Sequence, residues 1–86
     1  MKYVIPEDLL LQTVVDEMVI LDSASGKYYT LDIVATRMIN VFRETASIDR
    51  TLSILLGEYD VEACVLRQDL LDLLDKMVKA GLLRIV

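Results

Sequence analysis

Three aspartates, Asp69, Asp72 and Asp75, recur at every third position near the end of the chain and are the side chains best suited to chemistry. Carboxylates bind hard cations and act as general acids or bases. On a helix, Asp69 and Asp72 lie near each other and Asp75 lies further round, so the row does not converge on one point. We therefore expect a solvated charged helix face. The contrasting hypothesis is an enzyme subunit that uses this row.

Other reactive groups are sparse. The chain has one cysteine, Cys64, and no histidine. This excludes an internal disulfide and the Ser–His and Cys–His nucleophile pairs. A helix N-terminus can activate a thiol, but without a histidine partner we expect Cys64 to be a small buried residue. Because Gly26, Gly57 and Gly81 are isolated, they form no phosphate-binding loop. We expect no catalytic residue, no metal site and no cofactor.

Length, composition and charge predict one compact domain spanning residues 1–86. The chain has 86 residues, of which 55% are hydrophobic, and a net charge of −5. Scattered basic residues in an acidic chain argue against a nucleic-acid partner. No apolar run is long enough to cross a bilayer, and the first ten residues carry an acidic pair where a signal peptide needs apolar ones. We expect a cytoplasmic protein with no membrane partner.

The elements that must position any site are short strands followed by helices. Residues 9–15, 17–22 and 27–31 are rich in β-branched and aromatic residues and predict strands. A helical period starts after Asp32, again after Ser47, and again near Asp60, and each of these residues is a candidate N-cap. Gly81 is expected just after the third helix. This order predicts an α+β fold with the helices on one face of a small antiparallel sheet.

The strand over residues 27–31 is an aromatic one that we expect at a sheet edge. Alternation places Tyr29 and Leu31 on one face and Tyr28 and Thr30 on the other. An edge strand has unpaired N–H and C=O groups, and an apolar groove beside it suits a peptide that adds as a further strand. A winged-helix DNA reader is disfavoured, because its recognition helix would present the three aspartates to phosphates.

The stretch VILDSASGKYYTLDIVATRMINVF resembles the signature of the PqqD-like family. The matching features are the strand 19–22, Gly26, the Tyr28–Tyr29 pair, and Leu31 followed by Asp32 and a helix. The two later helices also match, so the resemblance covers nearly the whole chain. It implies a winged helix-turn-helix-like fold, with a three-stranded antiparallel sheet followed by three helices. It also implies a non-catalytic recognition element for ribosomally synthesised, post-translationally modified peptides, which binds the leader region of the precursor.

Site residues carried over from this resemblance lie on the third strand and the third helix. The leader would pair with the backbone of Lys27, Tyr28, Tyr29, Thr30 and Leu31. Along the helix, the groove would be lined by Asp69, Leu70, Leu73, Lys76 and Met77 if the polar border faces it. If the other border does, Leu71, Leu74 and Val78 replace them, and the sequence leaves both arrangements open.

Partners follow from the branch of the family that the chain resembles. It is most similar to the stand-alone B1 proteins of lasso peptide biosynthesis. This implies a precursor leader peptide and a B2-type cysteine-protease-like leader peptidase as partners, in a pathway with a cyclase related to asparagine synthetase. The alternative is a PQQ-biosynthesis-type peptide chaperone that presents its precursor to a radical SAM enzyme. A third possibility is a structural dimer formed through the edge strand.

Overall fold

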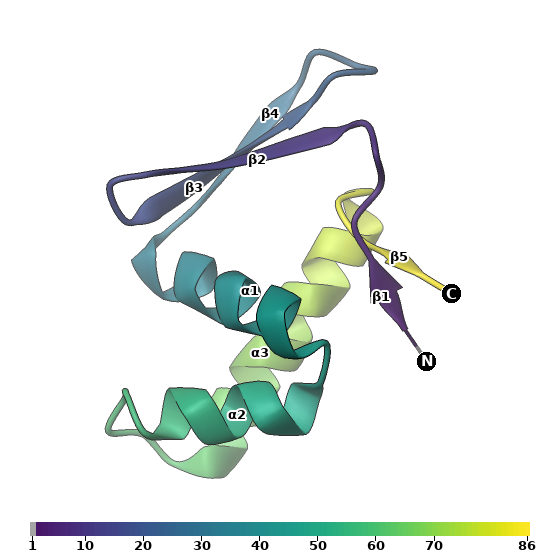
Figure 1. Ribbon diagram of the computed structural model, residues 1–86. Helices are drawn as coiled ribbons and strands as arrows, with labels where there is room; N and C mark the ends of the chain where they lie inside the picture. Colours follow the sequence, from purple (N-terminus) through teal and green to yellow (C-terminus); the bar gives the residue numbers. More distant parts are fainter. Residues whose placement is uncertain (1) are drawn as a thin grey trace.

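The computed structural model describes residues 2–86 and has the predicted α+β architecture (Figure 1). In chain order its elements are β1 (Tyr3–Val4), β2 (Leu9–Val14), β3 (Glu17–Asp22), β4 (Tyr28–Leu31), α1 (Ile33–Thr45), α2 (Ile48–Leu56), α3 (Ala63–Lys79) and β5 (Arg84–Ile85). The prediction of a three-stranded antiparallel sheet followed by three helices, in a winged helix-turn-helix-like layout, is confirmed.

The main sheet is an antiparallel meander in the order β2-β3-β4. Its first connection is tight, and Val15 takes a left-handed conformation there, with φ of 59°. In the second connection the Asp22 carboxylate accepts a hydrogen bond from the Ala24 N–H (3.0 Å), and Gly26 has φ of 76°. Glycine adopts this positive φ without the steric cost that a Cβ would bring.

Both ends of the chain meet in a second, two-stranded sheet. β1 pairs antiparallel with β5, and the hydrogen bonds continue from the Lys2 N–H to the Val86 carbonyl (3.1 Å) and from the Val86 N–H to the Lys2 carbonyl (2.8 Å). Figure 1 shows the two termini side by side beneath the main sheet. This pairing joins residues from opposite ends of the sequence, so no local pattern predicts it.

Most helix ends coincide with capping residues that the sequence predicts. The Asp32 carboxylate caps α1 by accepting from the Ala35 N–H (2.8 Å), and the Ser47 hydroxyl caps α2 by accepting from the Arg50 N–H (3.2 Å). α3 ends in a left-handed Gly81 with φ of 79°, as expected for a residue directly after the C-cap. These caps confirm two of the three predicted helix starts.

The predicted start of α3 at Asp60 is wrong. The helix begins at Ala63 after Glu62, and no side chain caps it. The expectation that Cys64 is buried is also wrong, because its side chain is exposed. The first turn of α3 extends beyond the core, and Leu66 is the first residue of the helix to be buried.

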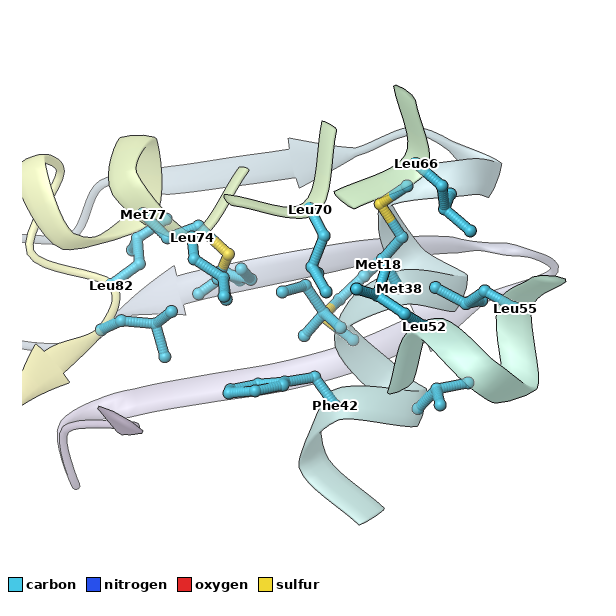
Figure 2. Packing of buried hydrophobic residues seen from close by; sticks show 14 of the residues in the cluster. Met18, Met38, Phe42, Leu52, Leu55, Leu66, Leu70, Leu74, Met77 and Leu82 are labelled. Atoms are coloured by element: carbon cyan, nitrogen blue, oxygen red, sulfur yellow. The ribbon is translucent and has the colours of Figure 1, made fainter. Parts of the chain in front are cut away.

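One core joins the helices to the inner face of the main sheet. In Figure 2, Leu70 and Leu74 of α3 face the same cluster as Met18 of β3 and Met38 of α1. Across the described residues the buried hydrophobic cluster consists of Leu9, Met18, Ile20, Met38, Ile39, Val41, Phe42, Leu52, Leu55, Leu66, Leu70, Leu74, Met77, Leu82 and Leu83. The outer face of the sheet remains uncovered, with Leu10 and Tyr28 exposed.

Candidate functional site

β4 is an edge strand whose backbone is half unpaired. Its register with β3 places Tyr28 opposite Leu21 and Tyr29 opposite Ile20. One step before this, the Asp22 N–H donates to the Lys27 carbonyl (2.8 Å), so that opposite pair is at a hydrogen-bonded position of the ladder. Opposite pairs alternate between bonded and non-bonded along an antiparallel ladder. It follows that Tyr29 bonds to β3.

The same alternation directs the N–H and C=O groups of Tyr28 and Thr30 away from β3. No strand within residues 2–86 pairs with that side of β4, because the sheet order ends there. Within the predicted pairing segment, Lys27 to Leu31, Tyr28 and Thr30 are therefore the two residues with outward backbone groups. The Lys27 carbonyl accepts from the Asp22 N–H of β3, and the alternation directs the backbone groups of Tyr29 toward β3 as well.

Side chains on β4 alternate as the sequence predicts. Tyr29 and Leu31 are half-buried and pack against the core, whereas Tyr28 and Thr30 are exposed. Tyr28 has 67% of its surface accessible and stands on the uncovered outer face of the sheet. The inward pair therefore anchors the strand, and the outward backbone groups stay accessible.

A shallow cavity of about 270 Å³ lies between the start of α1 and the middle of α3. The α1 side is formed by Asp32, Val34, Ala35 and Met38, and the α3 side by Asp69, Asp72, Leu73 and Lys76. Asp32 follows Leu31 directly, so the cavity begins where the β4 edge ends. We call the edge and this cavity together the edge groove.

The edge groove contains the polar border of α3, which was one of the two predicted arrangements. Asp69, Leu73 and Lys76 line it. Leu70 and Met77 are instead core residues, with 0% and 3% of their surfaces accessible, so their side chains lie behind the groove wall.

The opposite border of α3 does not contribute to this cavity. Leu74 is buried in the core, and Leu71 and Val78 are half-buried outside the cavity lining. The positions of these residues relative to the cavity favour the arrangement in which the polar border of α3 faces the groove. The role of each side chain toward a peptide stays a prediction.

Sequence reasoning missed the contribution of α1. Val34 and Ile33 are apolar and exposed at the start of this helix, although the buried stripe of α1 is formed by other residues. Of these two residues, Val34 lines the cavity, and its place off the buried stripe, shortly after the edge strand, was the signal that could have located this wall.

Charges at the edge groove are mixed and solvated. Asp72 accepts a hydrogen bond from the Gln68 amide (2.9 Å), and Asp75 pairs with Lys79 (3.0 Å) outside the cavity. Within residues 2–86, no group of three or more His, Cys, Asp or Glu side chains is placed to hold a metal ion. The arrangement offers hydrogen-bonding backbone, an apolar wall and a polar rim, which are the components of a binding surface.

A second cluster of hydrogen bonds closes the junction between β4 and α1. The Thr36 hydroxyl accepts from the Met18 N–H (2.9 Å) and donates to the Leu31 carbonyl (3.2 Å). Met18 and Leu31 are opposite each other in the β3–β4 register. The hydroxyl therefore bridges the Met18 N–H of β3 and the Leu31 carbonyl of β4.

Together, the sheet order, the three following helices and the open edge define a winged helix-turn-helix-like domain. Residues 17–83 match the family model of the coenzyme PQQ synthesis protein D (PqqD), and the chain belongs to this family. A search of the curated proteins finds no match. No helix in the described part of the chain is both long and apolar enough to span a membrane.

Two solved structures superimpose along almost the entire chain. One is TbiB1 in complex with the TbiA(beta) leader peptide, with a TM-score of 0.87, 27% identity, and coverage of 98% of this chain and 95% of that one. The other is a lasso peptide synthetase B1 complexed with the leader peptide, with a TM-score of 0.90, 21% identity, and coverage of 99% of this chain and 100% of that one. The second likeness establishes the fold alone.

Proposed function

We propose that this protein is a non-catalytic, cytoplasmic adaptor that binds the leader region of a ribosomally synthesised precursor peptide. The leader adds as a strand to β4 and is presented to a B2-type cysteine-protease-like leader peptidase in lasso peptide biosynthesis. The adaptor works without a cofactor. The single observation that carries this proposal is the open β4 edge, with outward backbone groups at Tyr28 and Thr30, directly beside a groove.

Strand addition gives alternate residues of β4 different roles: one pair would bind the guest, and the other holds the strand in place. A guest strand exchanges hydrogen bonds with Tyr28 and Thr30, and its alternate side chains enter the groove next to Val34 and Leu73. Tyr29 and Leu31 hold the strand against the core. Backbone pairing supplies affinity, and the groove supplies selectivity among side chains. The solved structure of TbiB1 in complex with the TbiA(beta) leader peptide, at 27% identity, supports leader binding by this chain.

A second candidate is a PQQ-biosynthesis-type chaperone that presents its precursor to a radical SAM enzyme. The family match favours it, since the matching model is that of a coenzyme PQQ synthesis protein. Both candidates use the same edge and differ in the enzyme served. A peptidase assay separates them. The lasso adaptor increases the rate of leader removal by the B2-type peptidase, and the chaperone instead forms a complex with a radical SAM enzyme.

The test of leader binding is a titration of ¹⁵N-labelled protein with a synthetic leader peptide. Candidate peptides are the leader regions of short open reading frames found by inspecting the genes that flank the gene for this chain. Strand addition shifts the amide signals of residues 27–31. Binding that is unchanged by any substitution in β4 would contradict the proposal. If the aspartates instead perform catalysis, replacing Asp69, Asp72 and Asp75 with Asn abolishes an activity while leader affinity persists.

A further inference from the structure

We infer that Thr36 is the positioning residue of the docking edge: its hydroxyl, inserted between β3 and β4, fixes the end of β4 where a guest strand must pair. The inference rests on the proposed function and deepens it. Thr36 lies on α1 and lines neither the cavity nor the outer edge of the sheet. It acts on a guest only through β4.

The Thr36 hydroxyl is buried and therefore depends on hydrogen-bond partners within the protein. Only 3% of the Thr36 surface is accessible, although threonine is mostly an exposed residue in proteins. A buried hydroxyl needs partners, and this one has two from opposite strands, the Met18 N–H and the Leu31 carbonyl. The side chain therefore links β3, β4 and α1 at one point.

The backbone of Thr36 is tied to the same junction. Its N–H donates to the Asp32 carbonyl (2.8 Å), which follows the outward groups of Tyr28 and Thr30 along the open edge. This is the first hydrogen bond of the helix, so α1 begins directly at the end of the open edge. The backbone and the hydroxyl of Thr36 therefore hold the same junction between β4 and α1.

Loss of the hydroxyl is expected to loosen the end of β4. Thr36→Val keeps the shape of the side chain but leaves the Met18 N–H and the Leu31 carbonyl without their bridge. The two strands must then fray or close directly on each other, and either change displaces Thr30. A guest must restore the edge before it pairs, so we expect leader affinity to fall about tenfold.

Thr51 provides a matched control. It is a second buried threonine, with 0% of its surface accessible, and its hydroxyl bonds to the Thr45 hydroxyl (2.8 Å) at the C-terminal end of α1. Thr51→Val removes a buried hydroxyl of the same kind from the α1–α2 contact. A purely structural role for Thr36 predicts equal effects of the two substitutions on leader binding.

The experiment combines calorimetric titration with the synthetic leader peptide that the wild-type protein binds in the titration above and amide hydrogen exchange of the free protein. We expect Thr36→Val to bind about tenfold more weakly and to speed exchange at Tyr29 and Leu31, with Thr51→Val at wild-type values and Thr36→Ser restoring both. If Thr36→Val does not fold, Thr36→Ala is measured in its place.

Wild-type affinity and wild-type exchange in the variant lacking the hydroxyl would overturn the inference, as would equal losses in Thr51→Val. If the wild-type protein binds no leader, the proposed function fails. The exchange rates at Tyr29 and Leu31 still decide whether Thr36 holds the edge, so the two failures are distinguishable.

Discussion

Proline at Thr30 is the perturbation that most selectively removes the docking edge. Register and alternation direct the Thr30 N–H away from β3, so proline there breaks no hydrogen bond of the sheet itself. Proline is tolerated on edge strands with this orientation, and the preceding residue, Tyr29, is already extended as proline requires. We therefore expect Thr30→Pro to fold and to lose leader binding.

The size of the effect follows from the groups involved. Substitution removes one backbone donor, worth about 1 kcal/mol net, and leaves a guest carbonyl facing the proline ring without a partner, at a cost of about 2 kcal/mol. Together these correspond to roughly a hundredfold loss of affinity. The free energy of unfolding of the unbound protein should change much less, because no native bond is lost.

Thr13 on the opposite edge provides the control. The Ser23 N–H donates to the Asp8 carbonyl (3.0 Å), which fixes the alternation of β2 against β3 and directs the Thr13 N–H outward. Thr13→Pro is thus the same chemical change at the same kind of exposed edge position. In a calorimetric titration with the leader, we expect Thr13→Pro to retain wild-type affinity. Equal losses in both proline variants, or none in Thr30→Pro, would refute the assignment of the edge.

Three further predictions concern the groove wall, the end of α3 and a surface ion pair. Leu73→Ala should weaken leader binding with a small effect on unfolding by urea, whereas Leu74→Ala, at a fully buried position, should destabilise the fold by about 2–5 kcal/mol; the reverse order would contradict the groove assignment. Gly81→Ala should cost about 1–2 kcal/mol in thermal unfolding, from its φ of 79° alone, since an added Cβ meets no atom within 4 Å. The hydrogen bond from Arg37 lowers the pKa of Glu58, so the stability from this pair is complete above the carboxyl's ordinary pKa and is lost as pH falls through the lowered value. The free energy of unfolding of Glu58→Gln, measured with urea, should therefore approach the wild-type value at acid pH. A difference that persists at acid pH would contradict the assignment of this stability to the Arg37–Glu58 pair.

Most of the fold could be predicted because the sequence patterns that define its strands and helix ends involve only a few neighbouring residues. Strand alternation, the Asp32 and Ser47 caps and the left-handed Gly81 each depend on a few neighbouring residues. Asp60 shows the limit of the same reasoning. A residue suited to capping is not enough where the chain still has to cross from α2 before the helix can start, and the structure begins α3 after Glu62.

The candidate site was only partly predictable because it depends on how distant elements pack. The choice between the two borders of α3 requires the position of α1, which contributes Val34 and Met38 to the cavity. The Thr36 bridge joins residues that are 18 positions apart in the sequence, Met18 and Thr36, and no local pattern marks it. Cys64 was misplaced for a similar reason, since its exposure depends on how far α3 extends past the core.

The most direct test of the central claim is amide hydrogen exchange of the protein with and without its leader peptide. Strand addition to β4 predicts that the outward amides of Tyr28 and Thr30 become protected in the complex. The outward amide of Thr13 on β2 should exchange at an unchanged rate. Protection at β2, or a bound leader that leaves Tyr28 and Thr30 unprotected, would contradict the account.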